Sequence, residues 1–287
     1  MAFFNRHNIY CNNMVNCNDV KEFYLPKSKI LSSIISGFAY YNYTNLKRND
    51  SLIGIFPNAT TNITFMLNGS LKDRNNIPIK EEVFAVCTTP IKLKQCENIE
   101  MIIIQLHTYG LNFFSNIPSN KLINNSLSLV DIFSLQEIGN IKDLLYFAST
   151  TQAKISILED FLLQKIDLKK MSKQIYYAHY LINQNSAISM DKLSELLCVT
   201  PRGLRKMFQR YYGMSPKFYV KIKRFNKSIN QITLNTNNSL TNIALNCGYY
   251  DQAHFNKDFK IFTSISPGNF IKKKATINDF YHVVFEK

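Results

Sequence analysis

Long apolar runs are missing from this sequence of 287 residues. No stretch approaches the ~18 consecutive apolar residues that a membrane-spanning helix needs, and the N-terminus lacks the apolar segment of a signal peptide. None of the 6 cysteines forms a C-x-x-C pair, and no histidine stands at zinc-ligand spacing from them. These absences predict a cytoplasmic protein with free thiols, without a membrane partner and without a bound metal.

The motifs of common enzyme classes are also missing. The sequence has no G-x-S-x-G, no phosphate-binding P-loop and no H-E-x-x-H. Its 5 histidines are scattered, and His107 stands out only because it follows an apolar run and lies next to Tyr109 and Gly110. A lone histidine in such a place is more often a hydrogen-bonded structural residue than a catalyst or a metal ligand. The sequence therefore predicts no catalytic residue, no cofactor and no enzymatic activity.

Acidic residues are scarce in one part of the chain. The formal net charge is +14, yet residues 172–275 contain 16 Lys and Arg against 4 Asp and Glu, which places +12 in that region alone. A polyanion is the natural partner of such a region, because cations that neutralise DNA phosphates release condensed counterions. We therefore expect double-stranded DNA as a partner; the alternative is a basic composition with no specific partner.

Residues 239–270, SLTNIALNCGYYDQAHFNKDFKIFTSISPGNF, predict two short helices joined by a tight turn. Ser239 and Asp251 are suited to be N-caps, and Gly248 fits a turn that needs a positive φ. Three aromatic residues at helical spacing predict the buried stripe of the second helix: Phe255, Phe259 and Phe262. A helix with an aromatic inner face and amides and cations outside is suited to the DNA major groove. The alternative is a solvated helix of any α-helical domain.

A second copy of this pattern lies at residues 189–219. The two copies are offset by fifty residues before the turn and by fifty-one after it. Thr200 is the expected cap of its second helix, and Pro201 suits the first helical position. Such a repeat indicates two copies of one supersecondary unit. The equivalent positions are Met190 and Leu240, Leu193 and Ile243, Cys198 and Gly248, Leu204 and Phe255, Phe208 and Phe259, Ser215-Pro216 and Ser266-Pro267, and Tyr219 and Phe270.

Two helix-turn-helix units joined by a helix, each followed by Ser-Pro, resemble the AraC/XylS family of bacterial transcription regulators. The resemblance covers roughly residues 172–272. It implies a DNA-binding transcription factor, such as an activator, that contacts RNA polymerase. Two departures concern the backbone: Cys198 stands where the first turn of the family usually has glycine, and Ser264 replaces the glycine that Gly213 keeps in the first unit. The first turn is therefore expected to be strained or differently shaped.

The family pattern implies that outward residues of the second helix of each unit read DNA. Arginine can pair bidentately with guanine, and asparagine or glutamine with adenine. A linker helix over about residues 217–232, on the order of 24 Å long, would bring the two recognition helices into successive major grooves about 34 Å apart. Four lysines, Lys221, Lys223, Lys227 and Lys260, and residues 272–274 are expected to contact phosphate or to solvate the surface. The predicted DNA-binding residues are Arg202, Arg205, Lys206, Gln209, Gln252, His254, Asn256, Lys257 and Lys260.

The preceding part of the chain is predicted to be β-rich. Short β-branched and aromatic runs at 52–56, 63–67, 83–87 and 101–106 are separated by turn residues, which predicts a small antiparallel sandwich or barrel. Ile103 and Ile104 are expected to be buried on both faces of their strand, since the run does not alternate. Two amphipathic helices follow, with starts expected near Asn140 and at Ser149. They serve either to form a homodimer or only to cover the sheet.

Together these patterns predict an α+β protein with three parts. Residues 1–166 would be a β-rich regulatory or dimerisation domain, a small β-sandwich or barrel with two helices, whose mouth leaves room for a small-molecule effector. Residues 172–275 would be an all-α DNA-binding domain of two helix-turn-helix units, 189–212 and 239–262, joined by a linker helix, and residues 276–287 a docked tail. The predicted function is sequence-specific regulation of transcription. The alternatives are a non-specific nucleoid-type DNA binder and a small-molecule-binding protein with a basic accessory domain.

Overall fold

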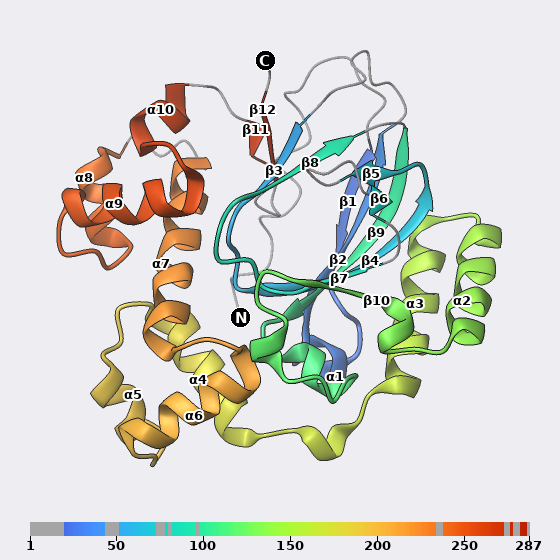
Figure 1. Ribbon diagram of the computed structural model, residues 1–287, viewed down its shortest axis with the longest axis horizontal. Coiled ribbons are helices and arrows are strands. Elements are labelled where there is room, and N and C mark those ends of the chain that lie inside the picture. Colours follow the sequence, from blue (N-terminus) through green and yellow to red (C-terminus); the bar gives the residue numbers. More distant parts are fainter. Residues whose placement is uncertain are drawn as a thin grey trace.

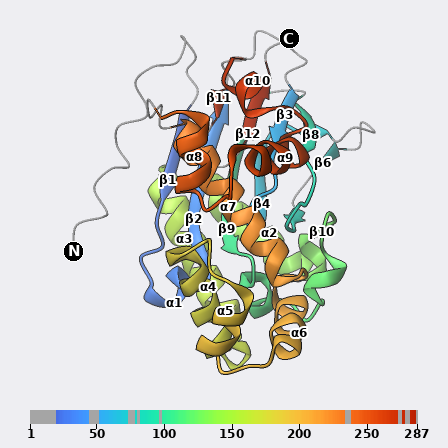
Figure 2. The same cartoon turned by 90° about the vertical axis from the view of Figure 1, so that its left-hand side faces the viewer.

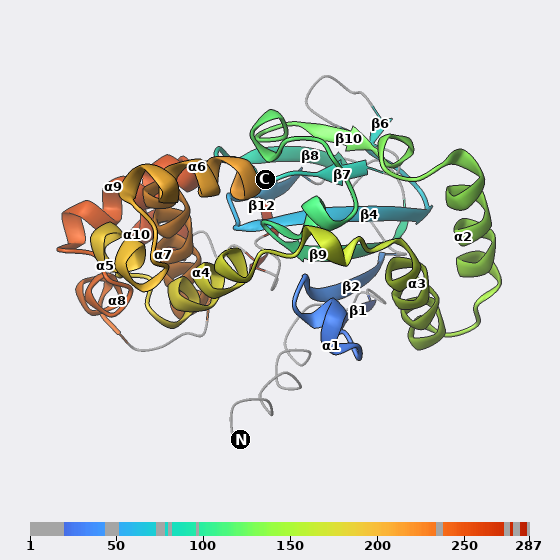
Figure 3. The same cartoon turned by 90° about the horizontal axis from the view of Figure 1, so that it is seen from below.

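The computed structural model describes residues 20–43, 52–72, 78–79, 82–95, 98–233, 238–272, 276–277 and 282–285. Two antiparallel sheets lie at the centre, with a pair of helices on one side and a larger helical group on the other (Figure 1). The view from below shows the sheets between the two helical groups (Figure 3). The predicted α+β class, with a β-rich N-terminal part followed by paired helix-turn-helix units, is confirmed.

The sheets contain six strands each among the described residues, in the orders β1-β2-β9-β4-β7-β10 and β11-β12-β3-β8-β5-β6. Strands β3, β4, β7 and β9 fall on the four predicted apolar runs, whereas β8 was not predicted. The bounds are β1 Val20–Tyr24, β2 Ile35–Tyr43, β3 Leu52–Ile55, β4 Thr60–Asn68, β5 Leu71–Lys72, β6 Pro78–Ile79, β7 Glu82–Phe84, β8 Ile91–Gln95, β9 Ile99–His107, β10 Ser126–Ser128, β11 Thr276–Ile277 and β12 His282–Phe285.

Strand β9 is buried on both faces, as its unbroken apolar run predicted. Ile104 and Leu106 belong to the larger core, which extends into the helical regions, whereas Met101 and Ile103 belong to a smaller core between the sheets. Successive side chains of a strand point to opposite faces, so one strand can contribute to two cores. Because β9 also pairs with β2 and β4, it lies at the middle of the N-terminal half.

The tail extends the second sheet. Strand β12 pairs antiparallel with β3, so that the Cα atom of His282 lies opposite that of Ile55 and Phe285 opposite Leu52. Strand β11 pairs with β12. The tail therefore docks, as predicted, and it does so as a strand partner of the N-terminal half.

Two helices, α2 (Leu135–Phe147) and α3 (Thr151–Lys165), stand on the far side of the sheets from the helix-turn-helix units (Figure 3). The expected start of α2 near Asn140 was wrong, because Ser134 and Glu137 form a capping box that begins the helix earlier. Similarly, α3 is capped by Thr150, whose side chain accepts from the Ala153 amide, and not by Ser149. Short helical segments occur at α1 Lys29–Ser32, η1 Gly110–Phe113, η2 Ser119–Lys121, η3 Leu129–Asp131 and η4 Leu168–Lys170.

The remaining helices form the C-terminal region, in which α7 runs between the two helix-turn-helix units (Figure 2). Its side chain Phe225 packs against Phe259 and Phe262 with ring centroids 5.5 and 4.8 Å apart, so the predicted aromatic stripe is buried. Within the described part of the chain, no helix combines the length and apolarity needed to cross a bilayer. The bounds are α4 Lys173–Gln184, α5 Met190–Leu196, α6 Pro201–Tyr212, α7 Pro216–Thr233, α8 Leu240–Asn246, α9 Gln252–Thr263 and α10 Pro267–Lys272.

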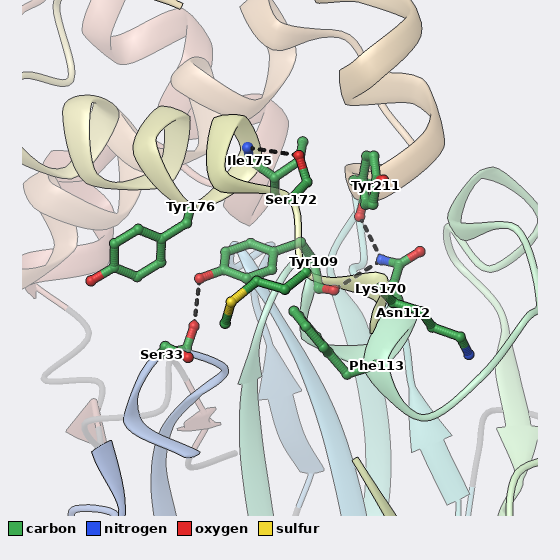
Figure 4. A pocket seen from close by; sticks show the side chains of 10 residues that line it. Ser33, Tyr109, Asn112, Phe113, Lys170, Ser172, Ile175, Tyr176 and Tyr211 are labelled. Atoms are coloured by element: carbon green, nitrogen blue, oxygen red, sulfur yellow. Dashed lines mark hydrogen bonds between the residues drawn. The ribbon is translucent and has the colours of Figure 1, made fainter. Parts of the chain in front are cut away.

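The end of α6 is held by the N-terminal half. The side chains of Asn112 and Ser119 both donate to the Tyr211 carbonyl oxygen, at 3.0 and 3.2 Å, beside a small surface hollow (Figure 4). Gly213 follows with φ +73°, and a Cβ there would lie 2.5 Å from the Ser119 carbonyl oxygen. Glycine is thus required both for the left-handed backbone and for the close approach of the two halves.

Two further contacts hold the second half of the C-terminal region. The Asn226 amide of α7 is oriented so that its nitrogen donates to the Pro57 carbonyl at 3.0 Å and its oxygen accepts from the Ala59 amide at 3.2 Å. The ring of Phe56 packs against that of Phe270 in α10, with centroids 5.8 Å apart. Both helix-turn-helix units are therefore docked on the same N-terminal body.

Three basic side chains lie close together where β9 meets α4 and α7. The rings of His107 and His179 are 4.4 Å apart, and His179 Nδ1 is 3.2 Å from the Tyr219 hydroxyl. Burial, and then repulsion by Lys223, lowers the pKa of His107 to about 4. Burial, together with His107 and Lys223, also lowers the pKa of His179, and burial lowers the pKa of Lys223 to about 8. His107 is thus a packed residue of the junction between the two halves.

These shifts predict that acid weakens the junction. A histidine whose pKa is lowered on docking favours the undocked, protonated state as the pH falls. The contribution of His107 is complete above its ordinary pKa of 6.5 and is lost as the pH drops towards 4. It amounts to about 3 kcal/mol at most. Melting curves between pH 7.5 and 5 should show this loss, and His107→Gln should flatten the dependence. An equally steep loss in the variant would contradict the assignment.

Candidate nucleic-acid interface

The first unit consists of α5, a turn and α6. Its sequence-predicted caps are formed, because the Ser189 and Thr200 side chains accept from the amides of Lys192 and Gly203. Pro201 occupies the first turn of α6, where a backbone N–H has no hydrogen-bond acceptor within the helix, so the missing N–H of proline costs nothing. The residues that anchor α6 are fully buried: Leu204, Phe208 and Tyr212.

The outward face of α6 carries the four residues predicted to read DNA, and all are exposed: Arg202, Arg205, Lys206 and Gln209. Gln209 also donates to the Gly213 carbonyl oxygen at 3.3 Å, which fastens it towards the end of the helix. The three cations have no salt bridge to an acidic side chain among the described residues. Their ammonium and guanidinium groups are free to meet phosphate or base edges.

The second unit, α8 and α9, repeats the same caps. The Ser239 side chain accepts from the Asn242 amide at 3.2 Å, and Asp251 accepts from the His254 amide at 2.7 Å. Behind Asp251 the aromatic stripe of α9 is completely buried. The turn that precedes it presents Tyr250, which is 88% exposed and which the sequence reasoning had not singled out.

The predicted reading face of α9 is less exposed than that of α6. Lys257 and Lys260 are exposed, but Gln252, His254 and Asn256 are half-buried. Gln252 accepts from the Thr241 hydroxyl at 2.6 Å, and the side-chain oxygen of Asn256 is buried without a hydrogen-bond partner. The two units therefore offer chemically different surfaces: the face of α6 is made mostly of exposed cations, whereas the face of α9 combines two exposed lysines with half-buried amides and a histidine.

The backbone explains the two departures from glycine. Cys198 has φ +52° and its equivalent Gly248 +84°, while Ser264 has +67° and its equivalent Gly213 +73°. Both copies thus adopt the left-handed conformation at the same two places, and each has glycine at only one of them. Because a Cβ disfavours this conformation, the first unit is strained at its turn, as predicted, and the second at the end of its recognition helix.

Three lysines of α7 were expected to contact phosphate or to solvate the surface. Instead, Lys221 lies 2.9 Å from the Asp258 carboxylate, and Lys227 donates to the Asn246 carbonyl oxygen at 2.7 Å. Lys223 lies among the histidines of the junction. Asp258, which the sequence reasoning missed, is a buried carboxylate on the aromatic side of α9. Its spacing from Phe255 and Phe262 places it on the inner face, but no local signal indicates its partner.

Comparison with known proteins finds similarity over the region that holds the two units. A helix-turn-helix domain family matches residues 193–273. The transcriptional regulator ArgR of Pseudomonas aeruginosa is 27% identical over 85 residues, which are 30% of this chain and 26% of ArgR. The XylDLEGF operon transcriptional activator of Pseudomonas putida is 30% identical over 81 residues, 27% of this chain and 25% of that protein. The chain thus spans about a quarter of the length of these curated relatives.

The comparison also matches solved structures. ToxT from Vibrio cholerae aligns with 88% of this chain and 98% of its own at 16% identity, with a TM-score of 0.44. A probable AraC family regulator from Rhodopseudomonas palustris aligns with 35% of this chain and 96% of its own at 28% identity, with a TM-score of 0.33. The matched sequence region holds both repeated units. Residues 193–273 are therefore a helix-turn-helix domain of the AraC/XylS type, the DNA-binding domain of a family of transcriptional regulators.

Proposed function

We propose that this protein regulates transcription by binding a specific DNA sequence through both units, with α6 and α9 in successive major grooves. The duplication carries this proposal: two capped recognition helices, each anchored by buried aromatic residues, present different polar faces on one linker helix. A non-specific nucleoid-type binder would share the positive charge but has no need of two amide-bearing or cationic faces at fixed spacing. A cytoplasmic regulator of this kind acts with RNA polymerase as a partner.

Selection of bound genomic fragments by the full-length protein tests this function, because it gives the site and the half-site spacing together. A regulator should prefer its site over bulk DNA by roughly a thousandfold or more. A preference near one would instead support the nucleoid-type alternative. On both kinds of duplex, the logarithm of affinity should fall linearly with the logarithm of salt, because phosphates are neutralised.

Arg205 is the residue of α6 from which we expect the largest effect on base preference. It is exposed and unpaired by acids on the outward face, one position beyond the buried Leu204. Arg205→Ala should cost ~1–3 kcal/mol on the preferred duplex and much less on random DNA. Arg210→Ala on the same helix is the control, since Arg210 is exposed but is not among the residues predicted to read bases, and its loss should weaken both duplexes alike. Equal losses for Arg205→Ala on both duplexes would contradict base reading.

We further propose that the N-terminal half senses a small apolar molecule. A small hollow between the two sheets has a cavity volume of about 40 Å³ and opens in part to solvent. Polar groups are few in it, which suits an apolar ligand fixed by one or two hydrogen bonds. Its lining includes Ile55, Asn62, Thr64, Leu93, Met101 and Ile103.

Filling the hollow should prevent such binding. Leu93→Phe adds volume at a buried wall position and should abolish the fluorescence that the amphiphilic probe 1-anilinonaphthalene-8-sulfonate gains at an apolar site. The variant should stay folded, because extra atoms in an empty space cost less than the ~1–3 kcal/mol of overpacking. Leu144→Phe, at an exposed position of α2, is the control. Undiminished probe binding by folded Leu93→Phe would place the probe elsewhere.

The outer side of α2 supports a homodimer. Leu144, Tyr146 and Phe147 are 54%, 78% and 80% exposed, and they lie on the side of the molecule away from the recognition helices (Figure 3). Exposed large apolar side chains that cluster in this way mark interaction sites.

A charge in this cluster should dissociate the dimer. Phe147→Asp should shift the protein from dimer to monomer in sedimentation velocity, because an ionised carboxylate cannot be buried there without a partner. Asp143→Asn, a polar change on the same helix, should leave the dimer intact. A wild-type protein that stays monomeric at ~100 μM, well above the range of a stable interface, would remove the proposal.

A further inference from the structure

Three cations of the linker helix contact the second unit. Lys221, Arg224 and Lys227 follow one another at intervals of three along α7 and so lie on neighbouring parts of its surface. Lys221 Nζ is 2.9 Å from Asp258 Oδ1 in α9, Arg224 donates to the Gly248 carbonyl oxygen at 3.1 Å, and Lys227 donates to the Asn246 carbonyl oxygen at 2.7 Å. We call these three residues the linker clamp.

The first contact of the clamp neutralises a buried charge. The Asp258 side chain is 3% exposed and sits on the aromatic face of the recognition helix. A carboxylate is costly in such a place unless a cation pairs with it. Lys221 supplies that cation, and its ammonium also lies over the Phe262 ring, 5.4 Å from the centroid. The other carboxylate oxygen has no hydrogen bond, and the nearest basic atom is His254 Nε2 at 3.7 Å.

The other two contacts hold the turn before α9. The last carbonyl groups of a helix have no partner within the helix and carry the negative end of its dipole, so cations stabilise them. Asn246 is the last residue of α8, and Gly248 lies in the turn. The Arg224 guanidinium also stacks over the Tyr249 ring, with 5.3 Å to the centroid. Asp251, the N-cap of α9, comes two residues later, so the clamp holds the recognition helix by its entry and by its inner face.

The opposite side of α7 is fixed to the rest of the molecule. Asn226 bonds to the loop at Pro57 and Ala59, and Tyr219 contacts His179. Because α7 is fixed to the first unit and to the N-terminal half, it determines where α9 lies relative to both. A hydrogen bond to a base is weakened when its donor–acceptor distance changes by more than a few tenths of an ångström. A loosely held α9 would therefore bind DNA but would discriminate poorly between base sequences.

We propose that Lys221, Arg224 and Lys227 are positioning residues that fix the second recognition helix on the linker helix and thereby set the half-site spacing the protein accepts. This role rests on the proposed sequence-specific binding through both units. It differs from the role usually given to lysines of a DNA-binding domain, which is to neutralise phosphates. The two roles have opposite signatures. Loss of a phosphate contact lowers affinity for all DNA and makes the salt dependence shallower by about one unit, whereas loss of a positioning residue lowers selectivity and leaves the salt slope unchanged.

Two variants test the clamp on the full-length protein. Lys227→Met keeps the length of the side chain but removes the charge. The double variant Lys221→Met/Asp258→Leu replaces the buried pair by apolar residues, which is often neutral or stabilising for the fold. Lys217→Met is the matched control, because Lys217 is exposed at the start of the same helix. Affinity is measured on the selected duplex, on the same duplex with one base pair inserted between the half-sites and on random DNA, each at two salt concentrations.

The clamp predicts that both variants lose about tenfold in the ratio of specific to random affinity, the size of one mismatched base pair. The penalty for the inserted base pair should shrink, and the salt slope should stay at the wild-type value. Amide hydrogen exchange should accelerate in residues 244–251 for Lys227→Met and in residues 252–263 for the double variant, without a matching fall in melting temperature. The Lys217→Met control should keep the wild-type ratio and exchange.

Two results would overturn the proposal. One is a shallower salt slope with an unchanged specificity ratio, which would make these lysines phosphate contacts. The other is unchanged exchange across residues 244–263 in both variants, which would show that the three residues do not hold the turn or α9 in place. If the wild-type protein itself prefers no sequence, the proposed function fails, and the exchange measurement still decides whether the clamp positions α9.

Discussion

Burial of the linker helix on nearly all sides is the constraint on which the rest of the structure depends. Helix α7 buries residues on several of its sides, among them Tyr219, Val220, Ile222, Phe225 and Ser228. It contacts α4, α6 of the first unit, α8 and α9 of the second, and the N-terminal half through Asn226. A helix used in this way cannot bend or slide without breaking several cores at once. The distance and orientation between the recognition helices are therefore properties of the whole protein.

The helix-turn-helix units could be predicted because their determinants are local. Caps such as Ser239 and Asp251 and the aromatic spacing of α9 lie within a few residues of the bonds they make. The fold class followed from the same kind of pattern. The first residue of a helix was harder to predict where two neighbouring residues could each act as the N-cap, as Ser149 and Thr150 could.

The sequence alone could not predict which side chains contact each other when they are far apart along the chain. Lys221 and Lys227 look like solvated or phosphate-binding lysines, because the residues they meet, Asp258 and Asn246, are 37 and 19 positions away. Asp258 itself resembles a surface charge until its helix is packed. The pairing of β12 with β3 has no local signal either, since it joins residues more than two hundred positions apart. The DNA-reading residues remain predictions, and only their exposure is now known.

The return of residues 282–285 to strand β3 has a consequence for how the two halves can separate. The helical region is attached to the β-rich half at both of its ends, through the segment before α4 and through the β12 pairing. Breaking the contacts of Tyr211, Asn226 and the two histidines would thus not release a freely diffusing module. The region would stay within reach of its docking site at a high effective concentration, and redocking would be an intramolecular step. A signal that opens the junction would act as a reversible hinge, reset as soon as the signal is withdrawn.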